Sequence, residues 1–285
     1  MKAVLYPNFQ KVNALGCARE VCDVLAQEGI EVCVSEKYRR EFSDKAAVNY
    51  ESIAESVKTA DVVIAIGGDG TILRCAKHLM GTDTKLLGIN TGTLGFMAGL
   101  EADQLDKLKR LKTGEYNISE RMTLDVVIGE GEATRRITAL NDVCVKSVNS
   151  RICDFEVYSD GYLIGRYRAD GALFSSPSGS TAYALSAGGP IIEPDLECIE
   201  MTLICPHSLF SRTTLFSAER RLLIKDTTSD VMRPMNITID GDYYADLTEG
   251  QSIEICRGRH KIKFIDLIGN SFHDSLCKKM MKPIK

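Results

Sequence analysis

The residues that could do chemistry begin with the run GGDGT at residues 67–71, which follows the apolar run DVVIAI and opens a helical pattern. Glycines at the carboxyl end of a parallel strand let the backbone approach a phosphate, and the N–H groups of the following helix can face it. A phosphate would repel the carboxylate of Asp69, which is better suited to bind a sugar hydroxyl or a metal ion. The spacing matches neither GxxxxGK[ST] nor GxGxxG. Spacing alone also allows a tight turn capped by Asp69.

A second unusual run is SPSGSTAYALSAGGPI at residues 176–191. It combines small residues, hydroxyl side chains and a glycine pair, and it lacks the apolar pattern of a packed core. Such a run offers much accessible, hydrogen-bonding backbone. A binding site explains this composition better than a core does.

The elements that would position the first run alternate between strand and helix. Short apolar runs predict strands at KAVLY, IEVCV, DVVIAI and KLLGI. Apolar residues have helical spacing from Ala14 to Leu25, and Gly29 is placed to end that helix. Further helical patterns cover residues 50–60, 71–80 and 103–114. Strands that alternate with helices predict a doubly wound α/β domain.

From about Arg121 the pattern becomes β-rich. TLDVVI, RRITAL, DVCVK and MTLICP alternate or run apolar without helical spacing. Asp160–Gly161 and Asp240–Gly241 each lie between two such runs and indicate hairpins. We therefore expect an α/β domain at residues 1–116 and a β-sandwich at residues 117–268. We expect residues 269–285 to form a C-terminal segment with a helix that packs back on the first domain.

Composition limits the classes of partner. The chain has 285 residues, is 44% apolar and carries a formal net charge of −4, whereas nucleic-acid binding needs clustered Lys and Arg. Neither a membrane-span pattern nor a secretory signal pattern is found. The 10 cysteines lack CxxC spacing, so we expect free thiols in a reducing cytoplasm.

Three features then coincide in order along the chain: GGDGT after the third strand, LND at residues 140–142, and RADGALFSSPSGSTAYALSAGGPI at residues 168–191. Together they resemble the NAD kinase family over nearly the full chain. The GSTAY…SAGGP run is specific to that family, whereas GGDGT is shared with diacylglycerol, sphingosine and phosphofructokinase relatives. NTGTLGFM and CPHSLFSRTTLF also resemble stretches of the family. The family fold, an N-terminal α/β domain and a C-terminal β-sandwich, agrees with the periodicity.

The resemblance implies transfer of the γ-phosphoryl group of ATP to the 2′-hydroxyl of the adenosine ribose of NAD, which gives NADP. It implies that Asp69 is the general base and that a divalent metal ion, Mg²⁺, takes part without a site fixed by protein alone. Both glycine-rich runs would line one nucleotide site, where small residues let the backbone lie flat against a base. The residues implied to face the ATP phosphates are Gly67, Gly68, Gly70 and Thr71. The residues implied to bind NAD are Asp69, Gly70, Phe96, Asn141, Asp142, Arg151, Arg168, Asp170, Thr181, Ala182, Tyr183, Ala184, Leu185, Ser186 and Asp242.

Two positions depart from the family pattern, and two other functions compete with this one. Asp142 stands where relatives more often have Glu, and Met97 stands where relatives often have an aromatic residue. The resemblance also implies a homodimer or homotetramer, with Arg168 and Asp170 at a subunit interface. The alternatives are a lipid or sugar kinase that shares the GGDGT loop, and a non-catalytic NAD-binding sensor.

Overall fold

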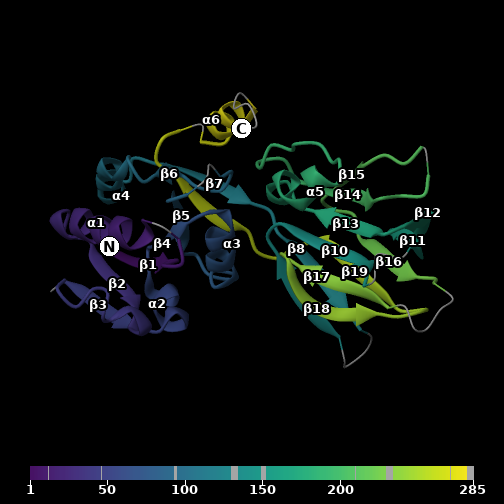
Figure 1. The fold of residues 1–285 in the computed structure, drawn as a ribbon, viewed down its shortest axis with the longest axis horizontal. Coiled ribbons are helices and arrows are strands. Elements are labelled where there is room, and N and C mark those ends of the chain that lie inside the picture. Colours follow the sequence, from purple (N-terminus) through teal and green to yellow (C-terminus); the bar gives the residue numbers. More distant parts are fainter. Residues whose placement is uncertain are drawn as a thin grey trace. The chain divides into compact units, whose positions relative to one another are not determined.

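The computed structural model describes residues 1–11, 13–45, 47–92, 95–129, 134–148, 152–208, 210–228, 234–269 and 271–280, drawn in Figure 1. The chain divides into two compact units. The first comprises Met1–Glu120 with Ile262–Lys285, and the second comprises Arg121–Lys261. Each unit is built on its own sheets and its own buried core.

The first unit contains an eight-stranded sheet with the order β3-β2-β1-β4-β5-β20-β7, and β6 pairs with β5. Its strands are β1 (Lys2–Pro7), β2 (Glu31–Ser35), β3 (Val48–Glu51), β4 (Val62–Gly67), β5 (Lys85–Asn90), β6 (Leu100–Glu101), β7 (Asn117–Arg121) and β20 (Ile262–Asp266). The chain runs from β1 outward to β2 and β3 and then returns to β4 on the other side of β1. The boundary between β1 and β4 is therefore the topological switch point, where open α/β sheets bind ligands.

The expected helices are present, with changed bounds. The helices of this unit are α1 (Ala14–Gln27), η1 (Glu36–Tyr38), α2 (Ile53–Thr59), α3 (Asp69–Lys77), η2 (Leu105–Lys109), α4 (Arg110–Thr113) and α6 (Ser271–Met280). Gly29 follows the end of α1 with φ 69°, as its position predicted. The pattern at residues 50–60 predicted one helix, but Tyr50 and Glu51 belong to β3, and α2 starts after Ser52, whose hydroxyl accepts the Glu55 N–H.

The second unit contains two six-stranded sheets. One has the order β15-β14-β13-β10-β17-β18 and the other the order β12-β11-β16-β19-β8-β9. The bounds of the first sheet are β10 (Asp142–Ser147), β13 (Gly171–Ser175), β14 (Cys198–Ile204), β15 (Thr214–Ser217), β17 (Met235–Ile239) and β18 (Asp242–Leu247). Those of the second are β8 (Leu124–Ile128), β9 (Arg135–Ala139), β11 (Cys153–Ser159), β12 (Tyr162–Ala169), β16 (Leu222–Asp226) and β19 (Ser252–Arg257). Both sheets contribute to one core that includes Phe155 and Phe174, so the predicted β-sandwich is confirmed.

Both predicted hairpin turns form. Asp160 and Gly161 join β11 to β12, and Asp240 and Gly241 join β17 to β18, all four with positive φ. Asp tolerates the left-handed region better than most residues, and glycine adopts it freely. The sequence therefore specified these turns locally.

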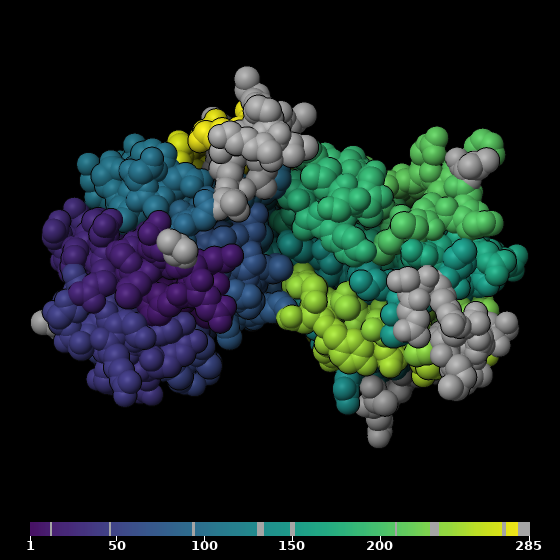
Figure 2. Space-filling model, in the orientation of Figure 1, coloured from purple at the N-terminus to yellow at the C-terminus, as the bar shows by residue number. Residues whose placement is uncertain are grey.

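The unit boundaries differ from the expected ranges 1–116 and 117–268. The strands β7 and β20 both lie in the expected β-sandwich range 117–268 but pair into the sheet of the first unit. Periodicity identifies a strand but not the sheet it joins, because that choice depends on distant partners. The C-terminal segment also contacts the first unit: in Figure 2 its yellow atoms lie beside atoms of residues near 100, and the rings of Phe96 and Phe272 are in contact.

Two further expectations concern helices and cysteines. In the described parts of the chain, no helix is both long and apolar enough to cross a membrane. All ten cysteines are free thiols. Cys22, Cys33, Cys144 and Cys205 each lie in an apolar run, which predicts burial; the first three are buried, whereas Cys205 is exposed.

Candidate active site

The GGDGT loop lies at the switch point of the first sheet. β4 is buried along its whole length and runs directly into Gly68, the N-cap of α3. A Cβ on Gly67 would overlap the Thr71 side chain, so only glycine fits there. A Cβ on Gly68 or Gly70 would meet no atom of the described residues within 4 Å, so their backbone is open to a ligand. The four residues predicted to face phosphates thus form a glycine turn at the N-terminus of a nine-residue helix.

The carboxylate of Asp69, at the first position of α3, is held by two backbone donors. The Phe96 N–H donates to Oδ2 at 2.9 Å and the Met97 N–H donates to Oδ1 at 3.2 Å. Each oxygen keeps a further lone pair, so the carboxylate can accept a proton while its orientation stays fixed. A Cβ on Gly95 would overlap this carboxylate. Gly95 is therefore a residue that supports the site and that motif analysis of Asp69 missed.

Next to this loop is a pocket of about 570 Å³. The residues that line it are Tyr6, Pro7, Asn8, Phe9, Gln10, Lys37, Tyr38, Thr71 and Arg74. The Asn8 amide donates to the Thr71 hydroxyl at 3.1 Å, which links the pocket wall to the glycine turn. The Tyr38 hydroxyl donates to the Pro7 carbonyl at 3.1 Å, and the Phe9 ring meets the Tyr38 ring edge-on. The pocket thus combines an aromatic wall with two cationic side chains, Lys37 and Arg74.

In the second unit, the LND corner and the SPSGS loop are tied together. The Asp240 carboxylate accepts the N–H groups of Leu140, Asn141 and Asp142, with distances of 3.1, 2.7 and 3.3 Å. The Ser176 hydroxyl donates to the Leu140 carbonyl at 2.5 Å, and the Ser176 N–H donates to the Asn141 carbonyl at 2.8 Å. The ends of β10, β13 and β17, which are neighbours in one sheet, therefore meet in one rigid corner.

This corner contains buried polar groups that the described part of the chain does not satisfy. Asn141 Oδ1, Ser178 Oγ and Glu200 Oε2 are buried without a hydrogen-bond partner there. An unsatisfied buried polar group costs about 1–3 kcal/mol, so a ligand that pairs with it gains affinity. Burial, together with the nearby Asp240 and Glu200, raises the pKa of Asp142 to about 7. Burial also raises the pKa of Glu200 to about 7.

The STAYALS segment forms η4 (Ser178–Thr181) and α5 (Tyr183–Ser186). Tyr183, Leu185 and Ser186 are exposed, and Thr181 and Ala182 are half-buried. These five residues present an accessible surface, and their role as a nucleotide wall stays a prediction. Ala184 instead is fully buried against Cys144 and Leu173. Its side chain anchors α5 to the sheet, and only its backbone could contact a ligand.

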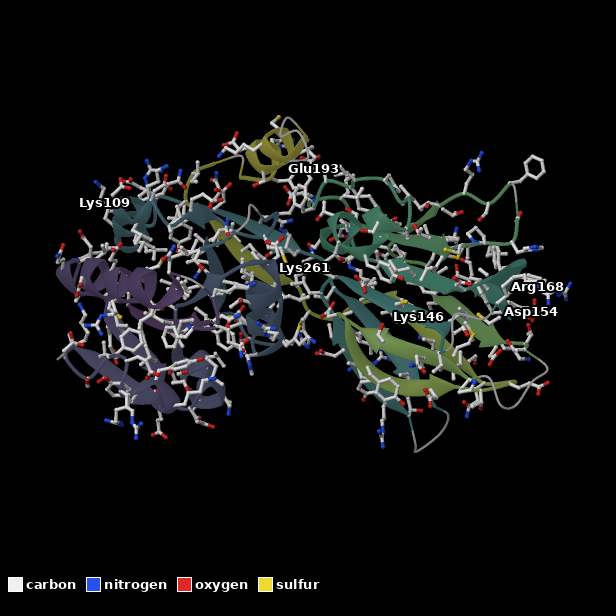
Figure 3. All side chains as sticks on the ribbon, in the orientation of Figure 1. Lys109, Lys146, Asp154, Arg168, Glu193 and Lys261 are labelled. Carbon is white, nitrogen blue, oxygen red and sulfur yellow. The ribbon has the colours of Figure 1, made fainter. Side chains whose placement is uncertain are left out.

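The remaining predicted residues are spread over the second unit. Arg168 is exposed on β12, and its Nε lies 3.5 Å from Asp154 Oδ1; both residues are labelled in Figure 3. Asp170 follows it, and its N–H and carbonyl are both bonded within the sheet. Asp242 is exposed at the start of β18. Arg151 lies outside the described residues.

Sequence reasoning missed three supports in this unit: Asp240, Ser176 and Glu200. Asp240 was interpreted only as a turn residue, and its φ of 50° agrees, but its carboxylate also caps three backbone N–H groups. Glu200 is fully buried and accepts the Thr202 hydroxyl at 2.8 Å. A charged residue in the apolar run CIEMTLI was the available signal for Glu200.

Asp69 is the carboxylate of the glycine loop that could ligate a divalent ion. Within the described ranges, no group of three or more His, Cys, Asp and Glu side chains is arranged to hold a metal ion. A divalent ion that a polyphosphate carries would take most of its ligands from phosphate oxygens. Asp69, in the loop itself, could contribute one carboxylate oxygen.

The chain is similar to known proteins over nearly its whole length. The model of the ATP-NAD kinase N-terminal domain matches residues 4–116, and that of the ATP-NAD kinase C-terminal domain matches residues 140–267. A curated NAD kinase of Moorella thermoacetica is 35% identical over 279 residues, which cover 96% of this chain and 87% of the relative. One of Natranaerobius thermophilus is 34% identical and covers 97% of this chain and 96% of the relative.

The fold matches solved structures of the same kind. A crystal structure of yeast NADH kinase complexed with NADH superposes with a TM-score of 0.89 at 23% identity, over 100% of this chain and 89% of that chain. An NAD kinase from Archaeoglobus fulgidus in complex with ATP gives a TM-score of 0.77 at 24% identity, over 99% of both chains. Both family models match in order and together span most of the sequence, so the chain belongs to the ATP-NAD kinase family.

Proposed function

We propose that this chain transfers the γ-phosphoryl group of ATP to the 2′-hydroxyl of the adenosine ribose of NAD, giving NADP and ADP. The observation that carries the proposal is the fixed carboxylate of Asp69 at the end of a glycine turn that opens a helix. Family membership supplies the reaction class. Membership also disfavours the lipid or sugar kinase alternative.

In this reaction the 2′-oxygen attacks the γ-phosphorus, and the bond to the β–γ bridging oxygen breaks. Asp69 accepts the hydroxyl proton as the new bond forms, and its two backbone donors keep the accepting oxygens in place. Most of the catalysis is positioning and charge stabilisation. The open backbone of Gly68 and Gly70 and the N-terminus of α3 are suited to the phosphates. Magnesium, when bound to the phosphates, supplies further charge neutralisation.

The donor would enter from the pocket beside the loop. Thr71 belongs both to the loop and to the pocket wall, so a chain of phosphates on the loop leads into the pocket. The aromatic wall of Phe9 and Tyr38 suits a nucleoside, and Lys37 and Arg74 suit phosphates. This combination favours ATP over a plain polyphosphate as donor.

The acceptor would use the corner of the second unit. Among the described residues, Asn141 Oδ1 and Ser178 Oγ have no hydrogen-bond partner, and ribose hydroxyls and adenine edges provide such partners. Asp142 is one methylene shorter than Glu, and its neutral form near pH 7 can donate as well as accept a hydrogen bond. Thr181, Tyr183 and Ser186 present the accessible wall beside it.

We also propose a homodimer or homotetramer in the cytoplasm. β12 is an edge strand, and it exposes Tyr162, Leu163 and Ile164 in sequence. An exposed apolar edge strand is a template for pairing with another chain. Arg168 and Asp154 lie on the same β11–β12 hairpin. Sedimentation of a fully active monomer at assay concentration would refute the proposal.

The decisive experiment is a product assay with Asp69→Asn. General-base catalysis is worth about 10²–10⁴ in rate, so we expect kcat to fall by that range while NAD still binds. Because the asparagine NH₂ cannot accept the Phe96 or Met97 N–H, a melting curve must accompany the assay. Wild-type protein with 2′-deoxy-NAD should bind it and give no product, and wild-type protein with inorganic polyphosphate should give less NADP than with ATP. Binding of NAD without NADP formation by wild-type protein would instead indicate the sensor.

A further inference from the structure

We propose that Lys146 binds a phosphate group of the dinucleotide in the second unit, and so determines affinity for the acceptor. This inference rests on the proposed function, because it assigns a further residue to the same acceptor site. Lys146 lies in β10, four residues after Asp142, and is labelled in Figure 3.

The face of the sheet on which Lys146 lies is defined by strand alternation. Val143 and Val145 point into the sandwich core, so Asp142, Cys144 and Lys146 point to the other face. Cys144 packs there against Ala184 of α5. Lys146 therefore shares the face that α5 covers.

A direct contact links Lys146 to the predicted nucleotide wall. Its Nζ lies 5.9 Å from the centre of the Tyr183 ring. Gly171 is opposite Lys146 in β13, and a Cβ there would crowd the Lys146 backbone and Cβ. The absence of a side chain at Gly171 leaves room for Lys146 beside the sheet. Its ammonium thus lies over the ring of Tyr183, an exposed residue.

The charge of this sheet makes Lys146 distinctive. It is the only Lys or Arg in the six strands of its sheet, all of which are fully described, and η4 and α5 contain none. On the same face these strands carry Asp142, Glu200 and Asp246, which the register aligns with the Lys146 side of the sheet. An acidic face repels a dinucleotide, whose diphosphate is negative, unless a cation is placed to meet it.

Lys146 is also available to a ligand. Among the described residues, no carboxylate forms a salt bridge with Lys146, and its ammonium contacts the Tyr183 ring. Its side chain is half-buried, so a phosphate that binds there is only partly screened by solvent. Charge-assisted hydrogen bonds to phosphate are stronger than neutral ones.

The test measures binding of three ligands to the full chain: adenosine, NAD and NADP. Lys146→Met keeps the length of the stem and removes the charge. We expect about tenfold weaker binding of NAD, which corresponds to about 1.4 kcal/mol, and unchanged binding of adenosine. Lys146→Arg should restore most of the affinity. The effect of Lys146→Met should shrink as salt rises.

The control is Lys225→Met. Lys225 is also half-buried but lies in β16 of the opposite sheet, so its removal should leave NAD binding unchanged. Equal losses for NAD and NADP assign Lys146 to the diphosphate. An NAD affinity within twofold of wild type, with or without a loss for NADP, or an equal loss for adenosine, would overturn the proposal. Binding does not require turnover, so this result is independent of the Asp69→Asn product assay.

Discussion

Gly95→Ala should displace the carboxylate of Asp69 and so lower activity, although the carboxylate itself is retained. An ideal Cβ on Gly95 would lie 2.6 Å from Asp69 Cγ, whereas ordinary contact begins near 3.4 Å. Gly95 is buried between this carboxylate and the start of the segment that supplies both donors, Phe96 and Met97. The carboxylate must therefore move by roughly 1 Å, and a misplacement of that size costs about 10²-fold in rate.

The size of the effect follows from the role assigned to Asp69. Complete loss of a general base costs about 10²–10⁴-fold, so Gly95→Ala should lower kcat for NADP formation by about 100-fold. The KM for NAD should change little, because the 2′-hydroxyl is only one of many acceptor contacts. Steady-state assays with ATP and NAD measure both values.

Gly92→Ala is the matched control. Gly92 precedes Gly95 by three residues, and a Cβ there would meet no atom within 4 Å. We expect it to keep near wild-type kcat and a similar melting temperature. If Gly95→Ala also kept kcat within about threefold of wild type, the orientation of Asp69 by Phe96 and Met97 would not matter. The assignment of a positioned base would then fail.

Two further predictions concern the second unit. Ser178→Ala removes a buried hydroxyl without a partner in the described residues, so the KM for NAD should rise several-fold while the melting temperature holds or rises slightly. Ser180→Ala loses hydrogen bonds to Pro177 and Ile192 and should instead lower the melting temperature. A lower melting temperature for Ser178→Ala than for Ser180→Ala would contradict both assignments. Burial raises the pKa of Glu200 from 4.5 to about 7. Between pH 4.5 and 7 the unfolded chain has therefore lost a proton that the folded chain keeps. As pH rises through this range, Glu200 lowers the free energy of unfolding. Relative to wild type, Glu200→Gln should therefore gain stability between pH 4.5 and 7, by at most about 1.4 kcal/mol per pH unit, with no further gain above pH 7. Urea titrations measure the free energy of unfolding of both proteins. A difference between the two proteins that does not change with pH would refute this prediction.

Several features of the fold were determined locally, and the sequence alone predicted them. The strands β1, β2, β4 and β5 are short apolar runs, and α1 has a buried face at helical spacing. The hairpin turns at Asp160 and Asp240 depend on residues that tolerate positive φ. The nucleotide-binding runs were also visible, because glycine and hydroxyl residues interrupt the apolar pattern.

Only the tertiary structure decided which distant residues meet. β20 joins the first sheet beside β5, although its sequence is as β-rich as the sandwich around it. Gly95 lies against the carboxylate of Asp69, and the Asp240 carboxylate accepts hydrogen bonds from the backbone of Leu140–Asp142. The Lys146 ammonium lies over the Tyr183 ring. The sequence separations in these pairs are long, so neither spacing nor composition records them. They depend on the pairing order of strands, which packing of the whole core determines.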